Sequence, residues 1–185
     1  MLEVPNLPPN HGTVRVRFDG RHCLVDTSIL HGKPLRLPET GENRLEHPAW
    51  GVRCSPRDGR WHIGWRPLHR LEGFERRLEG FGVAREEFER RHEETRPWSP
   101  FNYELTARLN RGGSVVGIVS GHRVVLHGDG TVDRIPVAEP ERKRLLVDEL
   151  GLSEELVDRL PPDVPTPPPP GSHTAAALSR EAVGS

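Results

Sequence analysis

The sequence predicts an α+β protein: an antiparallel β-barrel or twisted sheet with a small α/β lid and a disordered proline-rich tail. Apolar and polar residues alternate along several short segments that end in glycine turns, as in half-buried antiparallel strands. Charged or apolar helical segments are expected only after residue 84. Prolines then dominate the C-terminal stretch. We expect a barrel-like domain over residues 1–83, a lid over 84–160 and a disordered tail over 161–185.

The first predicted element is a β-hairpin. Apolar residues alternate on both sides of an Asp-Gly pair, which is typical of a type I′ turn. These residues are Val14, Val16, Phe18, Cys23 and Val25. A two-residue loop pairs Phe18 with Arg21, so Thr13 is expected opposite Asp26 on one face. His11 lies two residues before Thr13 on that face. It is therefore the diagonal neighbour of Asp26, at roughly 7 Å between backbones.

The remainder of the predicted barrel contains a second hairpin rich in tryptophan. An irregular loop and a short strand are expected over residues 27–37, and a polar loop follows. Residues 50–54 and 60–67 alternate as two strands around a Pro-Arg-Asp-Gly turn. Residues 68–81 are interpreted as a short strand or coil, because glycines interrupt their apolar positions.

The predicted lid begins with a charged helix over residues 85–94, which Phe88 anchors and two prolines end. A strand is expected over residues 101–109, and a glycine-turned meander follows. The meander strands are expected at 114–120, 122–127 and 131–137. Two helices are expected at 140–150 and 153–160, the first ending at a glycine and the second beginning at a serine cap.

Composition excludes several classes of protein. The 26 basic and 27 acidic residues give a net charge of −1, which provides no general attraction to nucleic acid or to an anionic membrane. No apolar run is long enough to predict a membrane span, and the N-terminus does not resemble a signal peptide. Two cysteines do not indicate a disulfide framework. We therefore expect a cytoplasmic protein that binds neither nucleic acid nor membrane.

His11 and Asp26 are the residues whose predicted placement indicates chemistry. A buried carboxylate beside a histidine fixes the tautomer of the ring and stabilises its charged form, as in two of the three parts of a nucleophilic triad. The alternative is a surface hairpin whose polar face happens to carry both residues. Spacing alone leaves both interpretations open.

Neither cysteine is a suitable third member. Cys23 is three residues from Asp26, so the pleat sends the two side chains to opposite faces, and we expect a buried, unreactive thiol. Cys54 ends a strand away from both residues. The histidines are scattered without metal-ligand spacing, so no metal site is expected, and no glycine-rich phosphate loop precedes a helix.

Two stretches together resemble the arylamine N-acetyltransferases. In that family a histidine opens a strand and the return strand ends in Leu-Val-Asp, matched here by His11 and residues 24–26. A Thr-x-Pro-x-Ser-x-Phe segment follows a helix, matched here by residues 95–101 (Thr-Arg-Pro-Trp-Ser-Pro-Phe). The tryptophan hairpin, the meander and the closing helix follow in the family's order. The resemblance covers roughly residues 6–152.

The sequence also departs from the family. After Asp26 the family continues Val-Gly-Phe-Gly, whereas residues 27–30 are Thr-Ser-Ile-Leu, and Arg90 stands where an Asn is usual. The family's nucleophilic cysteine lies in an N-terminal helical domain several tens of residues before the histidine. This chain begins ten residues before His11. It is therefore expected to correspond to the second and third domains, the barrel and the lid.

The resemblance implies acetyl-CoA-dependent acyl transfer to an arylamine or hydrazine through a Cys-His-Asp triad. His11 and Asp26 would be its catalytic residues, Thr95 and Ser99 would lie near acetyl-CoA, and no metal is required. Without the cysteine, the chain alone is expected to be inactive. A late-called gene start, a decayed gene or a separate chain with the helical domain would each explain this arrangement.

Two alternatives stay open at the level of sequence. One is a non-catalytic barrel module that binds a ligand or a partner chain, including a second copy of itself through an exposed apolar face. The other is a relative of the transglutaminases or cysteine proteases, which use the same Cys-His-Asp arrangement and need the same absent cysteine.

Overall fold

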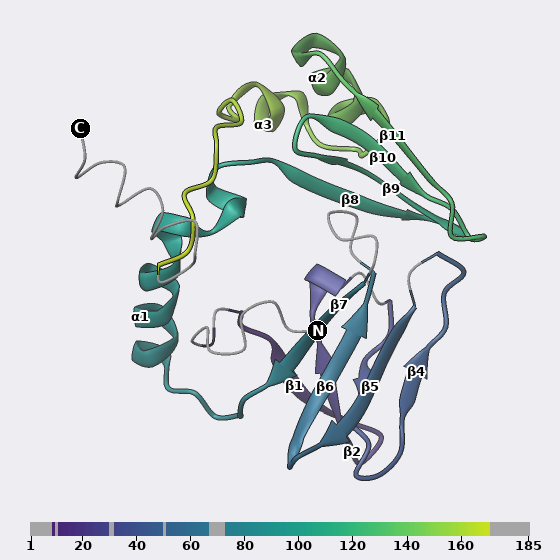
Figure 1. Ribbon diagram of the computed structural model, residues 1–185, viewed down its shortest axis with the longest axis vertical. Coiled ribbons are helices and arrows are strands. Elements are labelled where there is room, and N and C mark those ends of the chain that lie inside the picture. Colours follow the sequence, from purple (N-terminus) through teal and green to yellow (C-terminus); the bar gives the residue numbers. More distant parts are fainter. Residues whose placement is uncertain (1–8, 10, 30–31, 50, 67–72, 171–185) are drawn as a thin grey trace, which may run out of the picture.

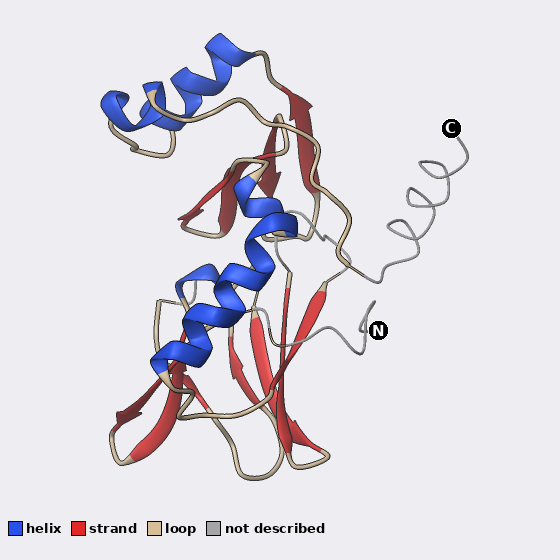
Figure 2. Cartoon of the chain, turned by 90° about the vertical axis from the view of Figure 1, so that its left-hand side faces the viewer, coloured by secondary structure: helices blue, strands red, loops and turns tan. Residues whose placement is uncertain are grey.

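The structure is a computed structural model that describes residues 9, 11–29, 32–49, 51–66 and 73–170. In this part of the chain the strands form three antiparallel sheets (Figure 1). The first two sheets build one lobe, which we call the first lobe, and the third sheet with two helices builds the second lobe. Helix α1 connects the two lobes at one side (Figures 1 and 2). The predicted α+β class is therefore confirmed.

The first sheet has the order β1-β2-β3, with strands β1 (Val14–Phe18), β2 (Arg21–Val25) and β3 (Leu35–Arg36). The register is as predicted: Phe18 pairs with Arg21 and Val14 pairs with Val25. Asp19 and Gly20 have φ values of 49° and 71°. Two consecutive positive φ values are those of a type I′ turn, whose twist matches that of the strands. The short 3₁₀ helix η1 (Thr27–Ile29) follows β2.

The second sheet has the order β4-β5-β6-β7. Its strands are β4 (Asn43–Leu45), β5 (Val52–Arg57), β6 (Arg60–Trp65) and β7 (Phe74–Leu78). The predicted tryptophan hairpin is β5-β6, turned at Asp58-Gly59 with φ values of 51° and 72°. Strand β7 lies within the segment over residues 68–81 that was interpreted as a short strand or coil, so the strand alternative holds for residues 74–78. Residues 50 and 67–72 of these predictions lie outside the described residues.

The first lobe is not a barrel, which corrects part of the predicted fold. Among the described residues no ladder joins the first sheet to the second, so both stay open. Their inner faces share one apolar core. The two sheets are therefore held together by packing and not by hydrogen bonds that would close a barrel. Its buried residues are Leu24, Ile29, Leu35, Leu37, Val52, Cys54, Ile63 and Trp65.

The segment after α1 (Arg85–Thr95) is not a strand, and the strand predicted over residues 101–109 is wrong in its first half. Two 3₁₀ turns, η2 (Arg96–Trp98) and η3 (Pro100–Asn102), follow the helix directly. The Tyr103 hydroxyl donates to the Pro97 carbonyl at 2.6 Å and so closes these turns. Pro97 and Pro100 lie within these turns, where their missing N–H groups disfavour a strand, and ladder pairing begins at Thr106.

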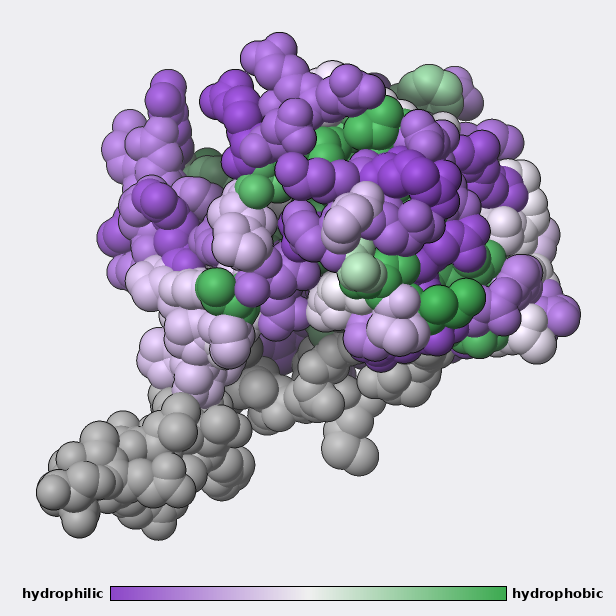
Figure 3. Space-filling view, turned by 90° about the horizontal axis from the view of Figure 1, so that it is seen from above, coloured by the Kyte–Doolittle hydropathy of each residue, from purple (hydrophilic) through white to green (hydrophobic). Residues whose placement is uncertain are grey.

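The third sheet has the order β11-β10-β9-β8. Its strands are β8 (Thr106–Arg111), β9 (Ser114–Val119), β10 (His122–Leu126) and β11 (Val132–Pro136). Helices α2 (Glu139–Asp148) and α3 (Glu154–Asp158) pack on it through Ile118, Leu146 and Val157. Ala49, from the first lobe, packs against another apolar cluster of the same sheet. Viewed from above, the molecule is mostly hydrophilic with scattered apolar residues (Figure 3).

The first part of the proline-rich tail is bound to the second lobe. Val164 N–H donates to the Tyr103 carbonyl at 2.8 Å, and the Asp163 carboxylate accepts from Leu105 N–H at 2.8 Å. The predicted disorder therefore does not hold for residues 161–170, because these hydrogen bonds anchor a segment that lacks a core of its own. Residues 171–185 of the predicted tail lie outside the described residues.

Candidate active site

The side chains of His11 and Asp26 meet at the open end of the first hairpin. His11 Nε2 lies 2.6 Å from Asp26 Oδ2, although the residues are 15 positions apart. The Asp26 side chain is 5% exposed and the His11 side chain is 28% exposed. The diagonal contact expected from the hairpin register is therefore present. A solvent-facing ring on a buried carboxylate is an arrangement suited to proton transfer.

Ser28 holds the second oxygen of the same carboxylate. Its N–H donates to Asp26 Oδ1 at 3.0 Å, and its hydroxyl donates to that oxygen at 2.6 Å. The turn η1 brings the serine back over the aspartate and so creates both bonds. The Asp26 carboxylate is thus fixed through one oxygen by His11 and through the other by Ser28. Strand parity in the sequence places Ser28 on the same face as Asp26, but Ser28 was not among the predicted site residues.

Two arginines from distant strands complete the site. Arg76, on β7, places Nη1 at 3.7 Å from Asp26 Oδ2 and at 3.3 Å from Ser28 Oγ. Arg108, on β8, donates from Nη2 to the Ser28 carbonyl at 2.5 Å. Neither arginine is among the site residues predicted from the sequence. Both contacts depend on how the sheets approach one another, and no local pattern in the sequence carries that information.

The electrostatics of the site favour an ionised Asp26. Burial raises the pKa of Asp26, but hydrogen bonds from His11 and Ser28 and the charges of His11 and Arg76 outweigh burial and lower it to about 2. Burial lowers the pKa of Arg76 to about 10, with a contribution from the nearby charge of Arg108, and Asp26 opposes the shift. Burial likewise lowers the pKa of Arg108. At neutral pH the aspartate is therefore negative and both arginines are positive.

The hydrogen-bond geometry defines the tautomer of His11. An ionised carboxylate only accepts, so the neutral ring donates its Nε2 proton to Asp26. Nδ1 is then the unprotonated nitrogen, and it makes no hydrogen bond with any residue that the structure describes. The ring can therefore take a proton at Nδ1 while Asp26 stabilises the resulting positive charge.

Ser28 is not placed as a nucleophile for this base. Its hydroxyl lies 3.5 Å from His11 Nε2, the nitrogen that Asp26 already holds, and it donates its proton to Asp26. In a nucleophilic triad the nucleophile and the carboxylate contact different ring nitrogens. Ser28 therefore positions Asp26.

Several solved arylamine N-acetyltransferases match this fold. The arylamine N-acetyltransferase of Salmonella typhimurium matches with a TM-score of 0.61 at 19% identity, over 98% of this chain and 64% of the other. The Mycobacterium marinum enzyme in complex with CoA matches with a TM-score of 0.64 at 18% identity, over 84% and 59%. The Mycobacterium abscessus enzyme gives 0.62 at 16%, over 82% and 57%.

The fold is that of the arylamine N-acetyltransferases. The chain spans only 57% to 64% of the length of these three structures. No protein-family model matches the sequence, and a comparison with curated proteins gave no match.

Neither cysteine lies where an acetyltransferase nucleophile could meet His11. Cys23 is 4% exposed and Cys54 is 0% exposed, and both are free thiols. Burial raises the pKa of Cys54 to about 12, with a smaller contribution from the charge of Glu42. A thiol of this kind stays protonated and inert at neutral pH. The sequence-based expectation that Cys23 is buried is confirmed, and Cys54 is buried as well.

Thr95 and Ser99, the residues that the resemblance places near acetyl-CoA, lie at the C-terminal end of α1 and between η2 and η3. The Thr95 hydroxyl donates to the His92 carbonyl at 2.9 Å, and the Ser99 carbonyl accepts from Asn102 N–H at 3.0 Å. Within the described part of the chain neither residue hydrogen-bonds to His11 or Asp26. A role in acetyl-CoA binding stays a prediction.

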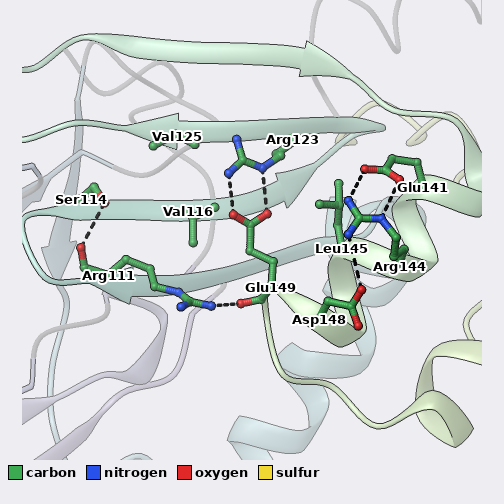
Figure 4. A pocket seen from close by; sticks show the side chains of 10 residues that line it. All are labelled: Arg111, Ser114, Val116, Arg123, Val125, Glu141, Arg144, Leu145, Asp148 and Glu149. Atoms are coloured by element: carbon green, nitrogen blue, oxygen red, sulfur yellow. Dashed lines mark hydrogen bonds and ion pairs between the residues drawn. The ribbon is translucent and has the colours of Figure 1, made fainter.

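An open pocket of about 630 Å³ lies on the second lobe (Figure 4). Most of the charged groups that line it pair with one another. Arg123 forms two bonds with the Glu149 carboxylate, at 2.8 and 2.5 Å, and Arg144 pairs with Glu141. Charges that satisfy each other leave little free capacity for a ligand. The pocket is therefore not the candidate site.

Among the described residues there is no group of three or more potential ligands placed to hold a metal ion. A search of the same residues found no helix with the length and apolar character of a membrane span.

Proposed function

We propose that this chain provides the histidine and the aspartate of a Cys-His-Asp acyltransfer site of the arylamine N-acetyltransferase type. The observation that carries the proposal is the 2.6 Å bond between His11 Nε2 and a buried, ionised Asp26, which leaves Nδ1 available. The match in fold supports the choice of reaction class. The histidine is catalytic, and Asp26 is its carboxylate partner.

The proposed chemistry depends on the unprotonated Nδ1 of His11. It accepts the proton of a cysteine thiol, and the thiolate attacks the carbonyl carbon of acetyl-CoA. The carbon–sulfur bond to CoA breaks, and the departing CoA thiolate takes the proton from His11. An arylamine or hydrazine then attacks the acetylated cysteine while His11 accepts the amine proton. The cysteine thiolate leaves and regains its proton from His11. Asp26 stabilises the His11 imidazolium in both half-reactions.

The nucleophilic thiol must come from outside these 185 residues, either from a longer polypeptide or from a separate chain. Cys23 and Cys54 are enclosed in the first lobe and cannot reach His11 without unfolding it. We therefore propose that the 185-residue chain alone forms no acetylated thiol and transfers no acetyl group. Thr95 and Ser99 are proposed to lie near acetyl-CoA when that thiol-bearing part is present.

A fusion tests this function directly. In this fusion, the part of the Salmonella typhimurium enzyme that this chain does not cover is joined to the N-terminus of the 185-residue chain. Acetylation of an arylamine by acetyl-CoA is then measured. We expect activity in the fusion and none in the 185-residue chain. His11→Gln and Asp26→Asn should each lower kcat of the fusion by about a hundredfold or more, as expected for a lost general base or its orienting partner.

A matched pair of control variants is available in the chain. His127 and Asp133 form another His–Asp contact, 2.8 Å long, but with exposed side chains. His127→Gln and Asp133→Asn should leave kcat of the fusion unchanged. Equal rates in the His11→Gln fusion and the unsubstituted fusion would show that His11 is not the base.

One observation favours a second function, a non-catalytic binding module. Val14, Phe18 and Val25 are 60%, 61% and 36% exposed on the first hairpin, although they are strongly apolar. Apolar residues gathered on one hairpin are typical of an interaction surface. A concentration-dependent dimer in analytical ultracentrifugation, together with an inactive and well-folded fusion, would favour this function over acyl transfer.

A further inference from the structure

The site contains more buried positive charge than its one carboxylate can balance. In the part of the chain that the structure describes, Asp26 is the one carboxylate within ion-pair distance of Arg76, and no carboxylate lies within that distance of Arg108. The two guanidinium groups also act on each other, since the charge of Arg108 lowers the pKa of Arg76. Two like charges therefore share one counter-ion.

The hydrogen-bonding capacity of that counter-ion is largely taken up. Oδ2 of Asp26 accepts from His11, and Oδ1 accepts two bonds from Ser28. Arg76 reaches Oδ2 only at 3.7 Å, beyond ordinary hydrogen-bond length. When His11 is protonated, three positive charges surround one negative charge. Asp26 therefore leaves the outer N–H groups of both arginines without an anionic partner among the residues that the structure describes.

Partial burial strengthens the electrostatic effect of this excess positive charge. The Arg76 side chain is 24% exposed, and its guanidinium stacks over the ring of Trp65 at 4.7 Å. Charges that are partly removed from water interact more strongly with one another and with any anion that enters. Arginine presents a planar fork of N–H groups that matches the two oxygens of a carboxylate. Both guanidinium groups contact Ser28, which itself binds Asp26, so both lie close to the His11–Asp26 pair.

We propose that Arg76 and Arg108 form a binding subsite for the carboxylate of a small-molecule ligand, beside the His11 ring. Binding supplies the counter-ion that the described part of the chain lacks. The subsite stands on these contacts alone. Its meaning for the reaction rests on the proposed function: the preferred acetyl acceptors are then amines that also carry a carboxylate, because the negative group directs the amine toward His11.

Benzoate and benzamide, which have nearly the same shape and differ in charge, test the subsite in the full 185-residue chain. Each is titrated at constant ionic strength and followed by calorimetry and by the NMR signals of the His11 ring. We expect saturable binding of benzoate with a shift of the His11 signals, and no binding of benzamide in the same range. Arg76→Gln and Arg108→Gln should each weaken benzoate about tenfold or more, as for a lost charge-assisted hydrogen bond.

Arg85→Gln is the matched control, because Arg85 is an exposed arginine of α1 paired with Glu89, and it should bind benzoate like the wild type. Arg108→Lys keeps the charge and tests the contribution of the fork, with affinity between those of the wild type and Arg108→Gln. If a Gln variant does not fold, the wild-type comparison of benzoate with benzamide decides by itself. Equal binding of the two compounds, absence of saturable benzoate binding, or undiminished binding in a folded Arg108→Gln variant would each overturn the subsite. None of these readouts requires acyl transfer, so an inactive fusion leaves the subsite standing.

Discussion

Asp26 is the residue on which the geometry of the site depends, because its carboxylate orients His11, Ser28 and Arg76 at once. Losing its charge would leave these donors facing a weaker acceptor inside a partly buried site. The cost of burying the carboxylate is offset by charge-assisted hydrogen bonds, which are among the strongest polar contacts in proteins. Its ionisation should therefore be visible in the stability of the whole chain.

We predict that Asp26 stabilises the chain above about pH 4 and loses this effect in acid. Its pKa is lowered from 3.8 to about 2, so the unfolded chain binds the proton first as the pH falls. The difference in unfolding free energy between the wild type and Asp26→Asn should shrink by about 1.5 kcal/mol between about pH 5 and about pH 2.5. Urea unfolding of both proteins measures it. A difference that stays constant would show that the carboxylate is not held in this way.

The hairpin register made His11 and Asp26 predictable from the sequence. An Asp-Gly turn fixes which residues face each other, and counting along two strands is then sufficient. Arg76 and Arg108 were not predictable, because each sits on a strand of another sheet whose position depends on tertiary packing. The His11–Asp26 pair is therefore encoded by local sequence, whereas the positions of the two arginines depend on the tertiary fold.

At the scale of elements, Phe88 of α1 lies against Gly12, the residue beside His11. Phe88 is 51% exposed, so it is not the buried anchor that the sequence indicated. Its ring lies so close to Gly12 that a Cβ added there would be 2.2 Å from Phe88 Cε2. Gly12 is therefore needed for the close approach of α1 to the residue beside His11.

Gly12→Ala should displace the Phe88 ring and lower the free energy of unfolding by about 1 kcal/mol. The double variant Gly12→Ala/Phe88→Ala should be less destabilised than the sum of the single variants, because the clash is then absent. Gly80→Ala is the control, since nothing lies within 4 Å of a Cβ at Gly80, and its effect should stay within about 0.5 kcal/mol. Additive effects in a double-mutant cycle would contradict the contact.

Other elements show why sequence patterns were insufficient. The alternation of apolar and polar residues over 101–109 corresponds to a strand only from Thr106. The earlier part forms 3₁₀ turns, which the hydrogen bond from Tyr103 to Pro97 closes. The proline-rich segment after residue 161 has the composition of disorder, yet Asp163 and Thr166 bind Leu105 and Glu104. Composition describes a segment by itself and does not include the partner groups that another element offers.

At the scale of the whole molecule, the two lobes have separate apolar cores. The first core lies between the first two sheets, and the second lobe packs Ile118, Leu145, Leu146 and Val157 between its sheet and its helices. The lobes meet through the apolar cluster that Ala49 forms with the third sheet, and at the candidate site through polar contacts such as the bond from Arg108 to the Ser28 carbonyl. The site therefore depends on both lobes being folded, although each has its own core.

Leu146→Ala should lower the free energy of unfolding of the second lobe by about 2 to 5 kcal/mol, because the side chain is fully buried and its removal leaves a cavity. Leu156→Ala is the control, since Leu156 is 47% exposed, and it should change stability by less than about 1 kcal/mol. Urea unfolding followed by the amide signals of each lobe separates the two effects. Equal destabilisation by both substitutions would contradict a core centred on Leu146.

The tautomer of His11 decides whether this chain can activate a thiol. ¹⁵N NMR of the labelled protein, at a pH at which the ring is neutral, reports which ring nitrogen carries the proton. We predict a protonated Nε2 and an unprotonated Nδ1 in the wild type, because Asp26 accepts from Nε2. Asp26→Asn should give a mixture of the two tautomers. A wild-type ring protonated at Nδ1 would contradict the proposed base and the acyltransfer site built on it.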